Sequence, residues 1–324
     1  MTIVRTYKVG TQKTIENALS RIQIGAESTF GNMTIFPLLN GDSGSVDYLT
    51  LDEALGRGLV QITEVSVQGS VPELKLKNES DQPVLLLDGE ELIGAKQNRV
   101  LNLTIMAPPK RTIIIPVSCV EAGRWSPRSA KFTTSSNAYF AQGRVKKMAQ
   151  VSSSLMSRGQ ARSDQEAVWA DISLKASHLK AESATAAMSD IYERYTKRID
   201  DYVGAFAAMD RQIGAVFTIN GNIIGFDLFD SPAIFKKLLP KLVRSYALDA
   251  IDMDTKKAAA PSREPVEELL LAITQAEAKT FPASGDGVDV RLTGPKFTGA
   301  ALIVNGRVVH LSAFRIERTA QEHD

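Results

Sequence analysis

The hydrophobic pattern of this chain changes its period near residue 137, and that change limits the folds open to it. Before this point, short runs rich in Val, Ile, Leu and Thr alternate with Gly, Pro and Asp, which is typical of β-strands. The runs are VQITEVSV (60–67), ELKLKN (73–78), PVLLLDG (83–89), RVLNLTIM (99–106) and RTIIIPVSCV (111–120). After it, apolar residues recur at helical spacing. We therefore expect an α+β fold in which strands and helices are segregated rather than alternating as βαβ units.

Helical spacing is clearest in the middle of the chain. It predicts three consecutive helices within 138–156, 163–181 and 184–209, and a short helix at 51–58 inside the β-rich part. Further along, Ser231-Pro232 should cap and begin another helix, because proline suits the first helical position.

The length of 324 residues suits one large domain or two ordinary ones. We expect a single α+β domain over 1–324. Its β-rich subdomain would cover about 1–130, and its helical and hairpin subdomain about 131–324.

Two segments repeat one another. GAVFTINGNIIGFDLF (214–229) and GAALIVNGRVVHLSAF (299–314) align without a gap, and each places Asn-Gly between two apolar runs, a strong signal for a two-residue hairpin. Two interpretations stay open. Buried hairpins can resemble one another by composition alone, or both hairpins belong to one sheet and form equivalent halves of it. In the second case Asp227 and Ser312 occupy corresponding positions.

The charges of the chain nearly cancel. There are 38 lysines and arginines against 37 aspartates and glutamates. Such a chain has no overall field to attract nucleic acid or a membrane, so neither is expected as a partner. The first residues lack the apolar run of a signal peptide, and one cysteine cannot form an internal disulfide. A cytoplasmic location is the expectation.

The single cysteine, Cys119, invites comparison with cysteine phosphatases. Their loop places arginine six residues after the cysteine, whereas Arg124 follows Cys119 by five. The apolar run before Cys119 instead predicts a small buried residue at the end of a strand. The histidines lack metal-ligand spacing, so a structural zinc site is not expected. A magnesium ion held by carboxylates stays open as a cofactor.

Charged and amide side chains are concentrated between Asp88 and Arg128, beside runs expected to be buried strands. Arginine and lysine bind phosphate, an aromatic face stacks on a ring, and amides bind hydroxyl groups. The ligand-binding candidates are Lys96, Gln97, Asn98, Arg99, Arg124, Trp125 and Arg128. This set suits a phosphorylated or nucleotide-like small molecule. The alternative is a solvated hairpin whose charges only keep the protein in solution.

Three segments carry a resemblance to a known family. They are DGEELIGAKQNRVLN (88–102), IPVSCVEAGRW (115–125) and GFDLFDSPAIFKKLLPKLVRSYALDA (225–250). Together they resemble a prokaryotic domain family named for its association with ADP-ribosylglycohydrolases and with rhodanese or phosphatase superfamily proteins. The resemblance covers most of the chain. It implies a place in NAD metabolism, in the processing of NAD-derived or ADP-ribose-like compounds, and a functional association with ADP-ribosylglycohydrolase-type proteins.

Four carboxylates are the candidates for catalytic work: Glu90, Glu91, Glu121 and Asp227. Asp227 is included because the resemblance places a family motif on it. Glu90 or Glu91 would act as general base or metal ligand. For a binding pocket, we expect the cations Lys96, Arg99 and Arg124 to converge on one anion position with Glu90 or Glu91 nearby.

Three functions are compatible with this pattern. The first is an enzyme, a hydrolase or a phosphoryl- or glycosyl-transfer enzyme, that acts on a phosphorylated, NAD-derived or ADP-ribose-like small molecule. The second is a non-catalytic nucleotide-binding module, and the third is a structural or interaction protein with a solvated polar hairpin. The pattern leaves the oligomeric state open.

Overall fold

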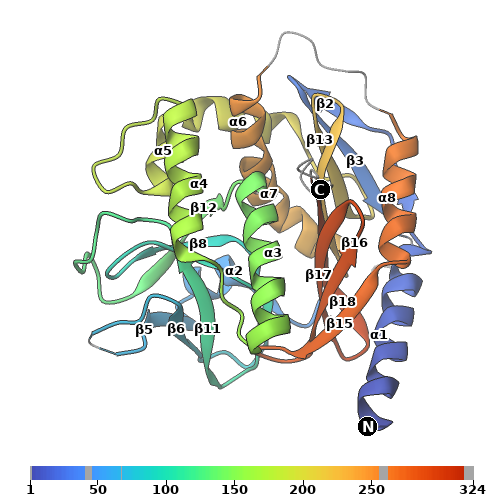
Figure 1. Ribbon diagram of the computed structural model, residues 1–324, viewed down its shortest axis with the longest axis horizontal. Helices are drawn as coiled ribbons and strands as arrows, with labels where there is room; N and C mark the ends of the chain where they lie inside the picture. The colour runs from blue at the N-terminus through green and yellow to red at the C-terminus, as the bar shows by residue number, and fades with distance from the viewer. Residues whose placement is uncertain (1, 41–45, 67, 255–261, 317–324) are drawn as a thin grey trace, which may run out of the picture.

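The protein is built from a closed β-barrel and a large antiparallel sheet that lie side by side, with helices between and around them (Figure 1). The computed structural model describes residues 2–40, 46–66, 68–254 and 262–316. The composition DTKKAAAPSREP predicts a linker over residues 254–265, of which residues 255–261 lie outside this description. Within the described residues, no helix has the length and apolar character needed to cross a membrane.

The large sheet joins strands from both ends of the chain. Its strands are β1 (Gln23–Ile24), β2 (Ser28–Phe30), β3 (Met33–Leu39), β13 (Gln212–Ile219), β14 (Asn222–Phe229), β15 (Glu277–Pro282), β16 (Val288–Gly294), β17 (Phe297–Val304) and β18 (Arg307–Arg315). Their order is β1-β3-β13-β14-β18-β17-β16-β15, with β2 paired to β3, and all neighbours are antiparallel. This segregated, antiparallel arrangement confirms the expected α+β class.

The barrel has a closed order of β11-β6-β5-β12-β8-β9, and a small sheet of order β10-β7-β4 accompanies it. The strands are β4 (Leu49–Thr50), β5 (Val60–Glu64), β6 (Glu73–Asn78), β7 (Val84–Leu86), β8 (Glu90–Gly94), β9 (Arg99–Leu101), β10 (Ile105–Ala107), β11 (Thr112–Cys119) and β12 (Phe132–Ala138). Buried aliphatic side chains such as Ile62, Leu76 and Val117 belong to one hydrophobic cluster with Phe132. The barrel is therefore filled by side chains rather than hollow.

The helices are α1 (Thr2–Leu19), α2 (Leu51–Gly56), α3 (Ala141–Arg158), α4 (Gln165–His178), α5 (Met188–Arg194), α6 (Thr196–Ala205), α7 (Pro232–Asp252) and α8 (Glu264–Thr274). Ser231 caps α7 as expected, because its side chain accepts a hydrogen bond from the amide of Ala233. The single helix expected over 184–209 was wrong. It is two helices that meet at Tyr195, whose backbone leaves helical geometry and whose hydroxyl donates to the carbonyl oxygen of Leu179.

The two Asn-Gly hairpins lie next to each other in the sheet, since β14 pairs with β18. In this pairing Asp227 stands opposite Ser312, while Gly225 faces Phe314 and Phe229 faces His310. The repeat makes Gly225 equivalent to His310 and Phe229 equivalent to Phe314, so the pair Gly225–Phe314 is equivalent to the pair His310–Phe229. The two hairpins are therefore related by a local two-fold axis through the Asp227–Ser312 pair. The hairpins are equivalent halves of one sheet.

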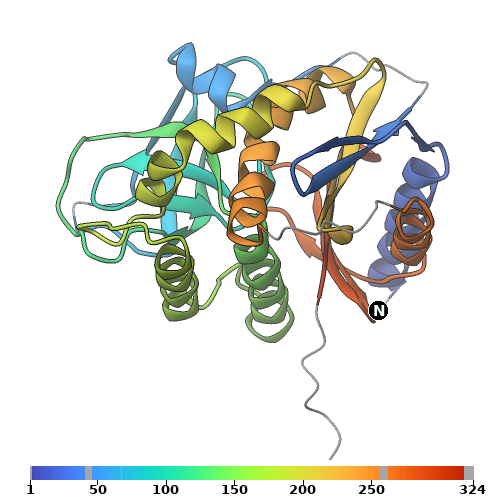
Figure 2. The same ribbon diagram turned by 90° about the horizontal axis from the view of Figure 1, so that it is seen from above.

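The equivalence extends beyond the hairpins. Each half has four strands in the linear order of the sheet, and each begins with a helix, α1 or α8. Ile15 of α1 and Val266 of α8 share one hydrophobic cluster with sheet residues, on the outer face away from the barrel (Figure 2). Barrel and middle helices are inserted between β3 and β13, which are neighbours in the sheet.

A network of buried ion pairs joins the barrel side to the sheet through α3. Arg144 of α3 donates two hydrogen bonds to Asp227 of β14, with N–O distances of 2.7 and 3.2 Å. Lys147, one turn further, donates to Asp88 between β7 and β8 and, at 2.9 Å, to the carbonyl oxygen of Leu101. All four ionised side chains are buried. Burial alone would raise the pKa of Asp227, but Arg144 and His310 outweigh it and hold that pKa well below its usual value.

We predict that Asp227→Asn lowers the free energy of unfolding by about 3–5 kcal/mol, because it leaves Arg144 buried without a counter-charge. Chemical denaturation measures the change. Since the folded pKa of Asp227 lies below its unfolded value, the wild-type contribution is present above about pH 4 and is lost as the pH falls below it. Ser312→Ala, directly opposite on β18, is the control and should change stability by about 1 kcal/mol or less. Equal stability of Asp227→Asn and wild type would contradict the prediction.

Candidate functional site

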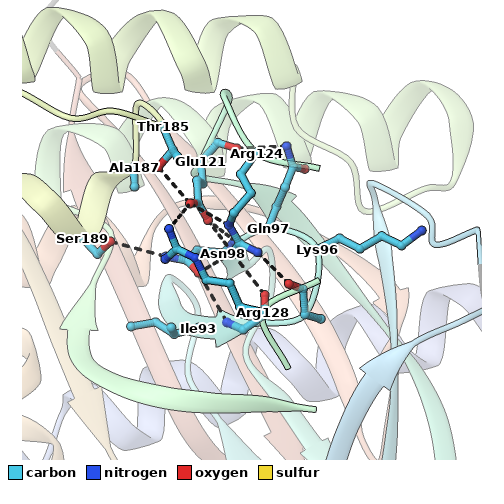
Figure 3. A network of polar contacts seen from close by, with 12 residues as sticks. Ile93, Lys96, Gln97, Asn98, Glu121, Arg124, Arg128, Thr185, Ala187 and Ser189 are labelled. Carbon is cyan, nitrogen blue, oxygen red and sulfur yellow. Dashed lines mark hydrogen bonds and ion pairs between the residues drawn. The ribbon is translucent and has the colours of Figure 1, made fainter. Parts of the chain in front are cut away.

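Most of the predicted ligand-binding residues lie together at one end of the barrel (Figure 3). Two segments bring them there. The turn between β8 and β9, residues 95–98, supplies one set, and the loop that follows β11, residues 120–131, supplies the other. Ala95 in the first segment has a positive φ of 37°, and its carbonyl oxygen accepts hydrogen bonds from Arg124 and from the amide of Arg128. The two segments are therefore bonded to each other as well as adjacent.

Glu121 and Arg124 form the centre of this end of the barrel. Arg124 binds both carboxylate oxygens of Glu121, with Nε–Oε1 and Nη2–Oε2 distances of 2.8 and 2.6 Å. Its Nη1 donates to the carbonyl oxygens of Ala95 and Ser126, at 2.6 and 2.8 Å. Burial raises the pKa of Glu121, but the bond to Arg124 and further donors reverse this and lower it. Arg124 is thus fully used in holding the two segments together.

Gln97 and Asn98, which lie beside this pair, also bond the two segments to each other. The backbone amide of Asn98 donates to Glu121 Oε2 at 3.0 Å, and Gln97 Nε2 donates to the carbonyl oxygen of Glu121 at 2.9 Å. Arg128 lies at the exposed rim, with Nη2 3.8 Å from Glu121 Oε1. Gln97 and Asn98 therefore stabilise the cluster, while Arg128 borders it.

Arg99 differs from Arg124 in the number of its partners. It is fully buried, yet among the described residues neither its Nε nor its Nη2 has a hydrogen-bond partner. Its Nη1 donates to Gln97 Oε1 at 3.0 Å. Burial lowers the pKa of this guanidinium. Two donor nitrogen atoms on a desolvated cation are left available for an acceptor that the described chain does not supply.

Trp125 and Lys96 lie beside Arg99. The guanidinium carbon of Arg99 is 5.6 Å from the centre of the Trp125 ring, and Lys96 Nζ is 5.2 Å from it. Trp125 is 47% exposed although it is large and apolar. The structure thus brings Lys96 and Arg99 to Trp125, and the expected convergence of these two cations with Arg124 on one anion position stays a prediction. Arg124 is held by Glu121.

Glu64 is a carboxylate at this site that the sequence reasoning missed. It ends β5, its Oε2 is buried without a hydrogen-bond partner among the described residues, and its Oε1 accepts from the amide of Lys96 at 3.4 Å. A Cβ on Gly69 would lie 3.2 Å from Glu64 Oε2 and 3.4 Å from the Trp125 ring, so both side chains border one backbone segment. The two-residue period of β5 was a usable signal, since it places Glu64 on the inward face with Val60 and Ile62.

Three of the predicted catalytic carboxylates lie elsewhere. Glu90 is buried against Lys241 of α7, with an Oε1–Nζ distance of 2.6 Å. Asp227 belongs to the ion network of α3 and β14. Glu91 accepts hydrogen bonds from Ser135 and Asn137, at 2.8 and 3.3 Å. Glu121 alone is part of the cluster, and it is paired with Arg124.

Cys119 is fully buried, as its sequence context predicts. Burial raises the pKa of its thiol, which lies 3.0 Å from Gln97 Oε1. A neutral, enclosed thiol fits the interpretation of a small buried residue at the end of β11. Among the residues that the structure describes, no three or more His, Cys, Asp or Glu side chains gather in a way that would hold a metal ion.

Glu91 gives rise to a pH-dependent prediction. Burial raises its pKa to about 7, and its Oε1 has no partner among the described residues. Because the folded pKa exceeds the unfolded one, stability falls as the pH rises from about 4.5 through 7. Glu91→Gln should remove this fall and stabilise the protein at pH 8 by up to about 3 kcal/mol. Denaturation curves at pH 5 and pH 8 measure it, and an equal loss of stability at both pH values would contradict it.

A comparison with protein-family models bears on this architecture. The ARG and Rhodanese-Phosphatase-superfamily-associated Protein domain matches residues 21–314, which include the barrel, the cluster at its end and the large sheet. No curated protein and no solved structure matches the chain. The match spans most of the sequence, and the chain therefore belongs to the family of ARG and Rhodanese-Phosphatase-superfamily-associated Protein domains.

Proposed function

We propose that the end of the barrel binds a phosphorylated small molecule of the ADP-ribose type. The observation that carries this proposal is the buried guanidinium of Arg99, which has two nitrogen atoms without a partner among the described residues. The family description, which associates these domains with ADP-ribosylglycohydrolases, supports the choice of ligand class.

The energetics of Arg99 favour an anionic ligand. Glu64 and Glu121 act on this cation electrostatically, but neither bonds Nε or Nη2, whereas a phosphate oxygen that accepts from these two atoms supplies both charge and hydrogen bonds. These two nitrogen atoms form one edge of the planar guanidinium, the edge that commonly binds phosphate with two parallel hydrogen bonds. Lys96, whose Nζ also lies over the Trp125 ring, is a second cation for a diphosphate.

Trp125 suits the other part of such a ligand. A half-exposed indole beside two cations offers an aromatic surface for a base, and stacking of this kind contributes roughly 1–3 kcal/mol per base. Arg128, exposed at the rim, adds a positive charge at the approach. A ligand with a ring at one end and phosphates at the other matches this order of side chains.

Catalysis at this site would depend on Glu64. It is the carboxylate beside Lys96 with a buried oxygen atom that lacks a partner among the described residues, so it can act as a general base toward water or a ligand hydroxyl. This assignment moves the catalytic role from Glu90 and Glu91, which lie elsewhere. It keeps the protein within the expected class of hydrolases or transferases that process NAD-derived compounds.

A non-catalytic nucleotide-binding module is the second candidate. The observation that favours it is the engagement of Glu121, which is bound to Arg124 and also accepts from Thr185 at 2.9 Å. A site with cations and a ring but only one available carboxylate suffices for binding. The third alternative, a solvated polar hairpin, is not supported, because Gln97, Asn98 and Arg99 are buried.

Arg99 and Arg124 provide a matched pair of variants. Arg99→Met should weaken ADP-ribose binding at least about tenfold, since a charge-assisted contact contributes roughly 1.5–3 kcal/mol. Its stability should equal or exceed that of wild type, because an unpaired buried charge is removed. Arg124→Met should instead lose about 3–5 kcal/mol of stability by leaving Glu121 unpaired. Calorimetric titration and thermal denaturation measure both. Unchanged affinity in Arg99→Met would overturn the proposed site.

Glu64→Gln separates the two candidate functions. If the protein is an enzyme, this variant should bind ADP-ribose like wild type and lose turnover by about 100-fold or more, as expected for removal of a general base. Chromatography of ADP-ribose incubated with each variant measures turnover, and Glu73→Gln on the half-exposed start of β6 is the control. Full turnover in Glu64→Gln would exclude the role given to Glu64. Binding without turnover in the wild type would identify a non-catalytic module.

A further inference from the structure

The two equivalent halves of the large sheet are covered differently on the face toward the barrel. In the first half, Tyr246 of α7 stacks on Phe217 with 3.9 Å between ring centres, and its hydroxyl lies so close to Gly225 that a Cβ there would be 2.6 Å away. In the second half, the residue equivalent to Gly225 is His310. One half is thus covered by the ring of Tyr246, whereas the other presents an imidazole.

The second half faces a small polar cavity of about 10 Å³, which is room for about one water molecule. Sheet side chains on one wall and the segment after β9 on the other line it, among them Asp88, Asn102, Thr104, Arg291, His310 and Ser312. The equivalent surface of the first half is covered instead by Tyr246 of α7, whose ring stacks on Phe217. The polar residues that line the cavity of the second half have no counterpart in that covering and are candidates for a function.

Thr104, His310 and Asp227 form a chain of hydrogen bonds at this cavity. Thr104 Oγ1 lies 2.8 Å from His310 Nδ1, and His310 Nε2 lies 3.2 Å from Asp227 Oδ1. Asp227 is ionised by its bonds to Arg144, so it accepts and Nε2 carries the proton. In a neutral imidazole Nδ1 then holds the free electron pair, and it accepts a hydrogen bond from the Thr104 hydroxyl.

We propose that Thr104 is a nucleophile for acyl transfer from a small uncharged carboxylic ester, with His310 as its general base. An oxygen nucleophile bonded to a base that a third group orients is the arrangement that such chemistry needs. Thr104 is partly exposed, unlike His310 and Asp227, so its hydroxyl is the member of the chain that a ligand can reach.

The reaction has two stages, acylation of Thr104 and hydrolysis of the acyl group. Oγ1 of Thr104 attacks the ester carbonyl carbon while its proton passes to Nδ1 of His310. The C–O bond to the alcohol breaks, the alcohol oxygen takes the bonding pair and then that proton, and an acyl-threonine ester remains. A water molecule then gives a proton to the same nitrogen and attacks the acyl carbon. The bond between this carbon and Oγ1 breaks, Oγ1 takes the proton from the nitrogen, and a carboxylic acid leaves, which restores Thr104 and His310.

The balance of charges at the cavity favours an uncharged ester over a phosphoryl compound as the substrate. The ionised groups in and around the cavity cancel, the acids being Asp88, Asp227 and Asp289 and the bases Arg144, Lys147 and Arg291. Each base is paired with one of these acids, so no free cation is left for a phosphate dianion. This second site therefore differs in chemistry from the barrel end, where Arg99 is unpaired.

The test uses p-nitrophenyl acetate with the full chain. Wild type should release p-nitrophenol and carry an acetyl group on Thr104, detected by peptide mass spectrometry. Thr104→Ser should keep the reaction. Thr104→Val, which has nearly the same shape, should lose the adduct at residue 104 and about 100-fold or more of the rate that depends on it. His310→Gln should do the same in a variant whose melting curve is intact.

Thr280→Val, on β15 and away from the cavity, is the matched control and should react like wild type. Acetylation confined to other residues in wild type, or a rate for Thr104→Val equal to wild type, would overturn the proposal. ADP-ribose binding at Arg99 is measured separately and is independent of either result.

Discussion

The buried ion pairs of α3 are the interaction on which the arrangement of this protein depends. Arg144 and Lys147 lie one turn apart on the same helix, and they bind Asp227 in the sheet and Asp88 beside the barrel. Breaking one pair would leave a charge in a medium that cannot solvate it, so the network strongly disfavours alternative packing. The network also positions neighbouring elements. Asp227 holds His310 on β18 by a hydrogen bond, and Asp88 precedes β8, the strand that leads to the cluster at the barrel end.

Two buried arginines at the barrel end illustrate how a fold separates structure from function. Arg124 has a carboxylate and carbonyl oxygens for its donors, so it contributes to stability and offers nothing to a ligand. Arg99 has the same chemistry and similar burial, but two of its nitrogen atoms have no partner among the described residues. An unsatisfied buried polar group needs an explanation, whereas a satisfied one does not. This contrast is the basis of the ligand position that we propose at Arg99.

Local sequence pattern predicted the helices and strands of this protein better than it predicted which strands pair and which side chains meet. The change of period after about residue 137 and the Asn-Gly turns predicted a segregated α+β fold with two related hairpins, because both signals act within a few residues. The pairing of β3 with β13 depends on segments separated by a whole inserted barrel, and no local pattern encodes it. Likewise, Arg99 and Arg124 look alike in the sequence, since the partner that distinguishes them is set by the closing of the barrel. Glu64 was missed because it lies outside the polar stretch, at the end of an apolar strand.

Nitrogen-15 NMR of the arginine Nε–H groups during a titration with ADP-ribose tests the central claim most directly. Each arginine reports its own hydrogen bonds, so the two guanidinium groups are read separately in one sample. We expect the Arg99 Nε–H resonance to move as the ligand saturates the protein, while that of Arg124, already bound to Glu121, stays in place. A ligand-dependent shift at Arg124 with none at Arg99 would contradict it.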